Sequence, residues 1–63
     1  GLPEYIVRAL KVGNDRMALR SAEAALRSAT EESVHAMLAQ GHSVRDVAGA
    51  VALTPGRIAQ LSA

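Results

Sequence analysis

The side chains that could take part in catalysis or metal binding are few and poorly spaced. His35 and His42 are the two histidines, and without a cysteine nearby they make a poor zinc site across a predicted helix end. Glu31 and Glu32 are adjacent, so a helix points them about 100° apart rather than jointly across a bond. The sequence has no nucleophile turn and no phosphate-binding glycine loop. We therefore predict no catalytic residues, no metal site, no cofactor and no enzymatic activity.

The apolar composition also argues against a substrate pocket. The 63-residue chain has 13 alanines but only 18 larger apolar residues, and it has no cysteine, tryptophan or phenylalanine. A chain this small buries roughly 60% of its unfolded surface, so its core is thin and lacks the walls of a pocket. The missing aromatic rings also exclude base stacking of the RNA-recognition type. Stability must come from close helix packing or from a partner subunit.

Helix-forming residues dominate the sequence, and we predict a single all-α domain over residues 1–63. Pro3 begins a short N-terminal helix, 3–12, in which Tyr5 is expected to fill the core. Gly13 follows, at the place where a left-handed C-terminal cap is expected.

A long central helix is predicted over residues 15–40, because no glycine or proline interrupts this stretch. The alternative is a break at 28–30, since Ser28 with Glu31 resembles a capping box. The apolar positions keep their phase over about five turns, which favours the unbroken helix.

One face of this predicted helix carries a stripe of small side chains. Such a stripe lets another helix approach closely, whether the short first helix, a second copy of the chain or another protein. With so thin a core, we expect a homodimer or another protein partner to use it. The predicted partner interface comprises Ala18, Ala22, Ala25, Leu26 and Ala29.

Two apolar residues of the same helix lie outside the stripe. Val34 and Leu38 fall on the face that carries Arg20 and Arg27 earlier in the helix. The helix must therefore be covered on a second side near its C-terminal end. The natural cover is the pair of short helices that follow.

Residues 43–62 contain the signals of two short helices joined by a turn. Gly41 closes the long helix, Ser43 is a good N-cap, and Thr54 followed by Pro55 begins the last helix. The apolar positions of this unit are Val47, Ala48, Val51, Leu53, Ile58 and Leu61.

The spacing of these positions resembles the helix-turn-helix DNA-binding motif over residues 43–63. The stretch Ser-Val-Arg-Asp-Val-Ala … Leu-Thr-Pro-Gly-Arg-Ile-Ala-Gln-Leu is also similar to the fourth region of sigma factors and to small bacterial transcription regulators. The resemblance implies a module that binds double-stranded DNA, in a bacterial transcription regulator or a DNA-organising protein.

The resemblance also implies roles for individual residues. Ser43 and Thr54 would lie near phosphates, because the free N–H groups of helix N-termini favour anions. Arg45 would contact a phosphate. Arg57 and Gln60 would reach base edges, where arginine can bridge guanine and glutamine can pair with adenine.

The sequence departs from the family pattern at two places. Ala52 stands where the turn usually has glycine, so either the backbone avoids the left-handed region or some strain is accepted. Pro55 and Gly56 stand where the family has long polar residues, and they would offer DNA their backbone instead of side chains.

The alternative function is a helical interaction module whose helix-turn-helix does not bind DNA. Residues 1–27 carry five basic and three acidic side chains, whereas residues 28–63 carry two and three. A basic surface around Arg45 and Arg57 would favour DNA. An exposed apolar groove along the long helix would favour a protein partner.

No stretch of the sequence is apolar over the length of a membrane span, and no secretory signal pattern is present. We therefore expect a soluble, cytoplasmic protein.

Overall fold

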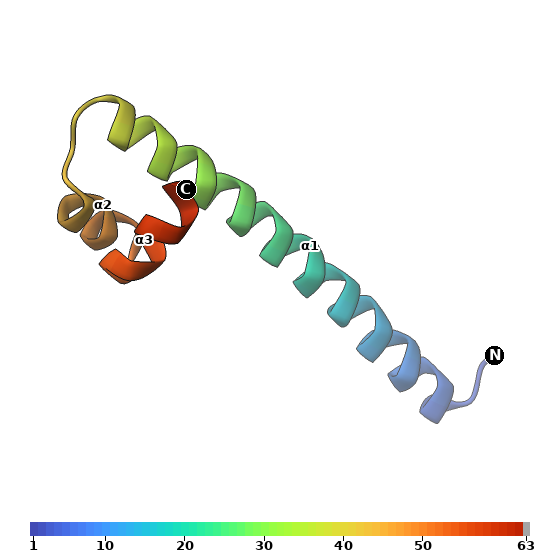
Figure 1. The fold of residues 1–63 in the computed structure, drawn as a ribbon. Helices are drawn as coiled ribbons and strands as arrows, with labels where there is room; N and C mark the ends of the chain where they lie inside the picture. Colours follow the sequence, from blue (N-terminus) through green and yellow to red (C-terminus); the bar gives the residue numbers. More distant parts are fainter. Residues whose placement is uncertain (63) are drawn as a thin grey trace.

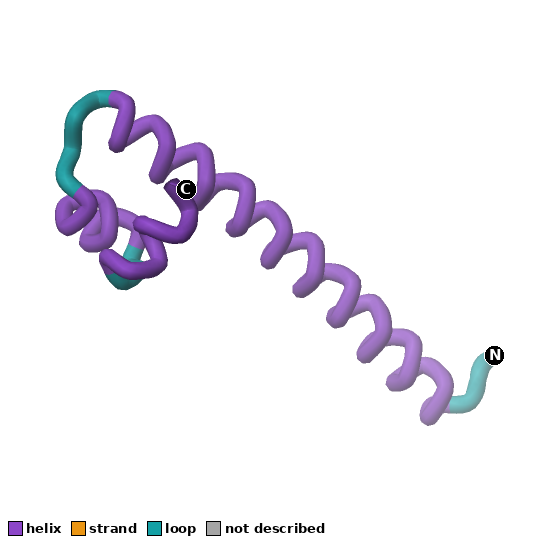
Figure 2. The backbone as a smooth tube through the Cα atoms, in the orientation of Figure 1, coloured by secondary structure: helices purple, strands orange, loops and turns teal. Residues whose placement is uncertain are grey.

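Three helices make up the computed structural model, which describes residues 1–62. Helix α1 spans Glu4–Ala39, α2 spans Val44–Val51 and α3 spans Pro55–Ser62. Helices α2 and α3 pack on each other and on the C-terminal end of α1, while the rest of α1 extends away (Figure 1, Figure 2). The molecule is 59 Å long and measures 18 Å by 17 Å across. The predicted all-α class is confirmed. We call α2, α3 and residues 30–39 of α1 the head, and residues 4–29 of α1 the rod.

The expected end of a first helix at Gly13 was wrong. Helix α1 continues through this residue, so the predicted helix over 3–12 and the predicted long helix over 15–40 are one element. Lys11 and Asp15 form a 2.8 Å salt bridge across Gly13, and such pairs support a helix by a few tenths of a kcal/mol. Starting a new helix would require a new nucleus, which is harder than accommodating one glycine at about 1 kcal/mol.

Helix α1 also runs unbroken through 28–30, as preferred over the capping-box alternative. The hydroxyl of Thr30 donates to the carbonyl of Leu26 at 2.6 Å, a bond that threonine forms inside helices. The helix ends at the expected glycine: Gly41 has a φ of 89°. Its N–H donates to the carbonyl of Leu38 at 3.0 Å, which satisfies one of the last free carbonyls.

A small core holds the three helices of the head together. Its buried side chains are Val34 from α1, Val47 and Ala48 from α2, and Ile58 from α3. Burying each valine or isoleucine contributes about 1.5–3 kcal/mol. Around them pack the partly buried Met37, Leu38, Val51, Leu53 and Leu61. The prediction that the short helices cover the second side of the long helix is confirmed.

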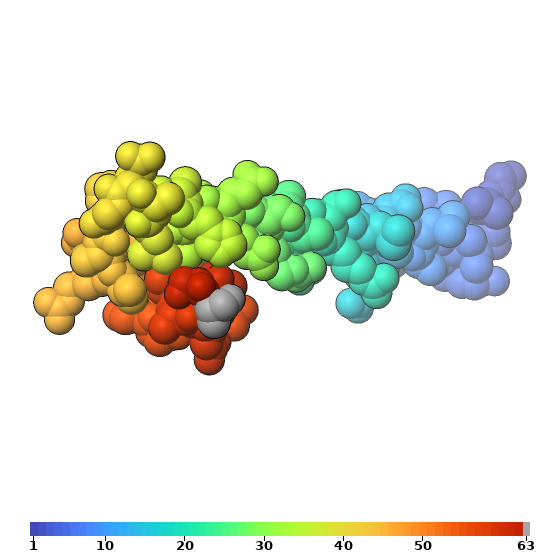
Figure 3. Space-filling model, turned by 45° about the horizontal axis from the view of Figure 1, so that its top comes forward, coloured from blue at the N-terminus to red at the C-terminus, as the bar shows by residue number. Residues whose placement is uncertain are grey.

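The N-terminal part of α1 lies outside this core and forms the rod (Figure 3). Tyr5, expected to fill the core, is 72% exposed. Residues 4–12 continue the line of α1, so they cannot fold back onto its stripe of small side chains. The first helix is thereby removed from the possible partners of that stripe.

The two structural glycines are expected to respond oppositely to alanine. Gly13→Ala should stabilise α1 by about 0.5–1 kcal/mol, because Gly13 is helical and an added Cβ meets no atom within 4 Å. Gly41→Ala should destabilise the chain by about 1 kcal/mol, because its φ of 89° strains any other residue. Circular dichroism on heating checks both signs. Gain of stability in Gly41→Ala would contradict the cap.

Candidate nucleic-acid interface

Ser43 serves as the N-cap of α2. Its hydroxyl accepts a hydrogen bond from the backbone N–H of Asp46 at 3.1 Å, and its own backbone is extended. The carboxylate of Asp46 lies in the first turn, where it complements the positive end of the helix dipole. Ser43 therefore fixes where α2 begins, which in turn places Arg45 on the exposed surface of its first turn.

Thr54 serves in the same way at α3. Its hydroxyl accepts from the backbone N–H of Arg57 at 3.2 Å, and its carbonyl accepts from Ile58 at 3.1 Å. Pro55 and Gly56 form the exposed start of the helix. A Cβ placed on Gly56 would meet no atom within 4 Å, so another molecule can approach this backbone closely.

The turn between α2 and α3 contains a strained residue. Ala52 caps α2 with a φ of 59° and a ψ of 42°, in the left-handed region. Of the non-glycine residues among 1–62, it alone has a positive φ. The backbone thus has a conformation that glycine adopts more readily than alanine, and this chain accepts the strain. In return the N–H of Leu53 donates to the carbonyl of Ala48 at 3.0 Å, closing the turn.

Arg57 and Gln60 form a hydrogen-bonded pair on α3. A guanidinium N–H of Arg57 donates to the amide oxygen of Gln60 at 3.0 Å, and both residues are exposed. The bond orients the guanidinium. The N–H groups that remain on the two side chains are donors, which suit the acceptors of guanine and of phosphate.

The arginines of the head have no carboxylate partner among residues 1–62. The salt bridges in that part of the chain are Glu4–Arg8 and Lys11–Asp15, both in the rod. Arg45 and Arg57 are exposed and therefore available to an anion. The basic surface is nevertheless small, because only these two arginines belong to α2 and α3.

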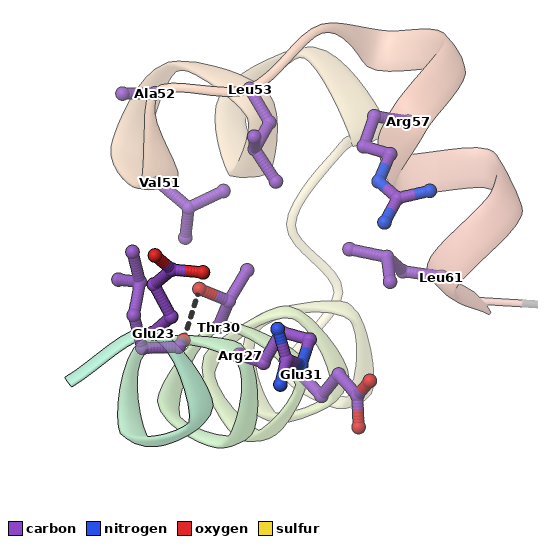
Figure 4. A pocket seen from close by; sticks show the side chains of 10 residues that line it. Glu23, Arg27, Thr30, Glu31, Val51, Ala52, Leu53, Arg57 and Leu61 are labelled. Atoms are coloured by element: carbon purple, nitrogen blue, oxygen red, sulfur yellow. Dashed lines mark hydrogen bonds between the residues drawn. The ribbon is translucent and has the colours of Figure 1, made fainter. Parts of the chain in front are cut away.

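A groove of about 400 Å³ separates the middle of α1 from the turn between α2 and α3 (Figure 4). The sequence analysis placed Leu26 in the partner interface and Arg57 in the DNA interface, but it did not predict that the two line one groove, because the groove forms only when distant segments meet. Arg57 lines the groove beside Leu61, so the arginine predicted to read bases also belongs to the surface of the groove. The residues lining it are Glu23, Leu26, Arg27, Thr30, Glu31, Val51, Ala52, Leu53, Arg57 and Leu61.

The two histidines and the apolar segments were the remaining candidates for a metal site and a membrane span. The ring Nε2–H of His35 donates a hydrogen bond to the carbonyl of Leu61 at 3.1 Å, which joins α1 to the end of α3. Residues 1–62 contain no cluster of three or more histidine, aspartate or glutamate side chains that could hold a metal ion. No helix in the same part of the chain has the length and apolar character needed to cross a membrane.

Comparisons with protein-family models, with curated proteins and with solved structures find no match to this chain.

Replacing Ala52 with glycine should stabilise the head. Glycine adopts the left-handed region without the cost of about 1–2 kcal/mol that a Cβ imposes, and its greater freedom when unfolded takes back part of this gain. We expect a net gain of about 1 kcal/mol in urea denaturation. Ala50→Gly is the matched control, because Ala50 is an exposed residue inside α2. It should lose about 0.5–1 kcal/mol, and a loss in Ala52→Gly as well would contradict the strained turn.

Proposed function

We propose that this chain is a helix-turn-helix module that binds double-stranded DNA, within a cytoplasmic bacterial transcription regulator or DNA-organising protein. The observation that carries the proposal is the Arg57–Gln60 pair, a cluster of hydrogen-bond donors on exposed α3. A major groove edge with the N7 and O6 acceptors of guanine is the ligand that fits such a cluster.

The starts of α2 and α3 support the same function. Ser43 and Thr54 each satisfy one of the free N–H groups of their helix, and both helices begin at exposed residues. Because Pro55 has no N–H, α3 offers fewer such groups than α2. Phosphates of the DNA backbone would bind there, with Arg45 as an additional contact. Pro55 and Gly56 would allow the start of α3 to approach the duplex closely.

Arg57→Ala should weaken binding of a selected duplex by about 1–3 kcal/mol, because it removes the donor cluster of α3. Fluorescence anisotropy at low salt measures this affinity. Arg20→Ala is the control, since Arg20 is equally an exposed arginine but lies on the rod. Its affinity should stay close to that of the unchanged chain.

The salt dependence separates base contacts from phosphate contacts. Arg45→Ala should weaken binding to all duplexes alike and lower the slope of log affinity against log salt by about 1. If the unchanged chain binds no duplex, or if Arg57→Ala and Arg20→Ala have the same effect, the proposal is wrong.

A second function, a helical interaction module that does not bind DNA, is favoured by one observation. The groove beside Leu26 combines apolar side chains with charged ones of both signs, as a protein-binding surface does. A chain that binds a protein partner but no duplex, at any salt concentration, would support this function instead.

A further inference from the structure

The single chain exposes more surface than a compact protein of its size. Its accessible surface is 5024 Å², whereas a folded chain of 6.6 kDa is expected to expose about 3,900 Å². Its radius of gyration is 18.2 Å, against about 11 Å for a compact chain of this length. The excess surface, about 1,100 Å², matches the roughly 800 Å² or more that each partner buries in a stable dimer.

Four of the exposed apolar side chains of the rod follow a seven-residue repeat, while Val7, Leu10 and Met17 are exposed outside it. Tyr5, Val12, Leu19 and Leu26 are each separated by seven positions, and all four are 54–72% exposed. Small residues follow three positions after the last two, at Ala22 and Ala29. This spacing is typical of the seam of a two-stranded coiled coil, with Arg8 and Asp15 at the corresponding positions after Tyr5 and Val12, and it contains or flanks every residue of the predicted partner interface. Ser33 and Ala36 continue the seam and stay exposed beside buried Val34, while Leu26 also lines the groove between α1 and the turn from α2 to α3.

We propose that a second copy of the chain lies antiparallel along this seam. In the proposed register, the residue numbers of two side chains that face each other across the dimer sum to 41. In this register Leu26 faces the partner's Asp15, whereas the other three large side chains of the seam each meet a small one: Leu19 faces the partner's Ala22, and Val12 faces the partner's Ala29. Tyr5 likewise faces the partner's Ala36. Large against small is the pairing that allows two helices to approach closely without voids.

Charge decides the orientation and the register. The antiparallel pairing sets Arg16 beside the partner's Glu23 and Lys11 beside the partner's Glu32, and two-fold symmetry forms each pair twice. A parallel pairing sets Lys11 beside the partner's Arg16 and joins like charges at Arg8 and at Asp15. Moving the antiparallel register by seven residues brings two Glu23 side chains or two Arg16 side chains together. In the chosen register both of these charged pairs join opposite charges.

The proposed dimer does not depend on the proposed DNA binding, so it can be tested without DNA. The chain has no cysteine, which makes introduced cysteines specific probes. Val12→Cys and Ala29→Cys chains, mixed and oxidised, should form a mixed disulfide. Either variant alone should not, because its two cysteines are about 26 Å apart in this register and a disulfide requires Cα atoms within about 7 Å. Cross-linking of each variant with itself would indicate a parallel dimer and overturn the proposal.

Sedimentation equilibrium at low salt provides the second test. Lys11→Glu should weaken the dimer about tenfold, and so should Glu32→Lys. The double variant, Lys11→Glu with Glu32→Lys, should return to within about twofold of the original affinity. A parallel dimer predicts the opposite sign for Lys11→Glu, since it relieves the contact with Arg16. The proposal is overturned if the unchanged chain is a monomer at tens of micromolar or if Lys11→Glu strengthens the dimer. It is also overturned if the double variant does not recover the original dimer affinity.

Discussion

The burial of Val34 beneath α2 and α3 is the contact on which the head depends. Each of these two helices has only eight residues, well below the roughly 12–15 at which an isolated helix becomes marginally stable. Their positions therefore come from the core that Val34 shares with Val47, Ala48 and Ile58, together with the two side-chain caps. The candidate interface inherits this dependence, because Arg57 is the neighbour of buried Ile58 on α3.

Helix α1 uses one face to pack against α2 and α3 and presents another face to the proposed second copy. Val34 and Leu38 point into the core, whereas the seam of Tyr5, Val12, Leu19 and Leu26 remains exposed. A partner on the seam and a duplex on α3 therefore do not require the same residues of α1. In the proposed antiparallel pair the two heads lie at opposite ends of the rod. The thin core of the single chain is then an expected property of one half of a dimer.

The sequence predicts those parts of the structure that local signals determine. The caps at Ser43 and Thr54 were recognisable, and Val34 was recognisable because it fell outside the main stripe. The helix end predicted at Gly13 was wrong, because the tendency of glycine to cap a helix was considered without the helix-forming sequence on both sides of it. The groove could not be predicted, since it forms only after α2 and α3 have packed against α1. The Arg57–Gln60 bond joins residues three positions apart on α3, so the sequence indicates that the two side chains are neighbours but not that they bond to each other. The seven-residue spacing is visible in the sequence, but its exposure is a property of the fold.

Amide hydrogen exchange, resolved by residue, can show whether the head folds within one chain while the rod needs a second copy. The measurement compares a dilute sample that sedimentation shows to be monomeric with a concentrated one. We expect the amide of Leu38 to exchange slowly in both samples, whereas that of Leu19 should be protected only in the concentrated one. Equally slow exchange of Leu19 and Leu38 in the monomer would contradict it, because the rod would then be stable without a partner.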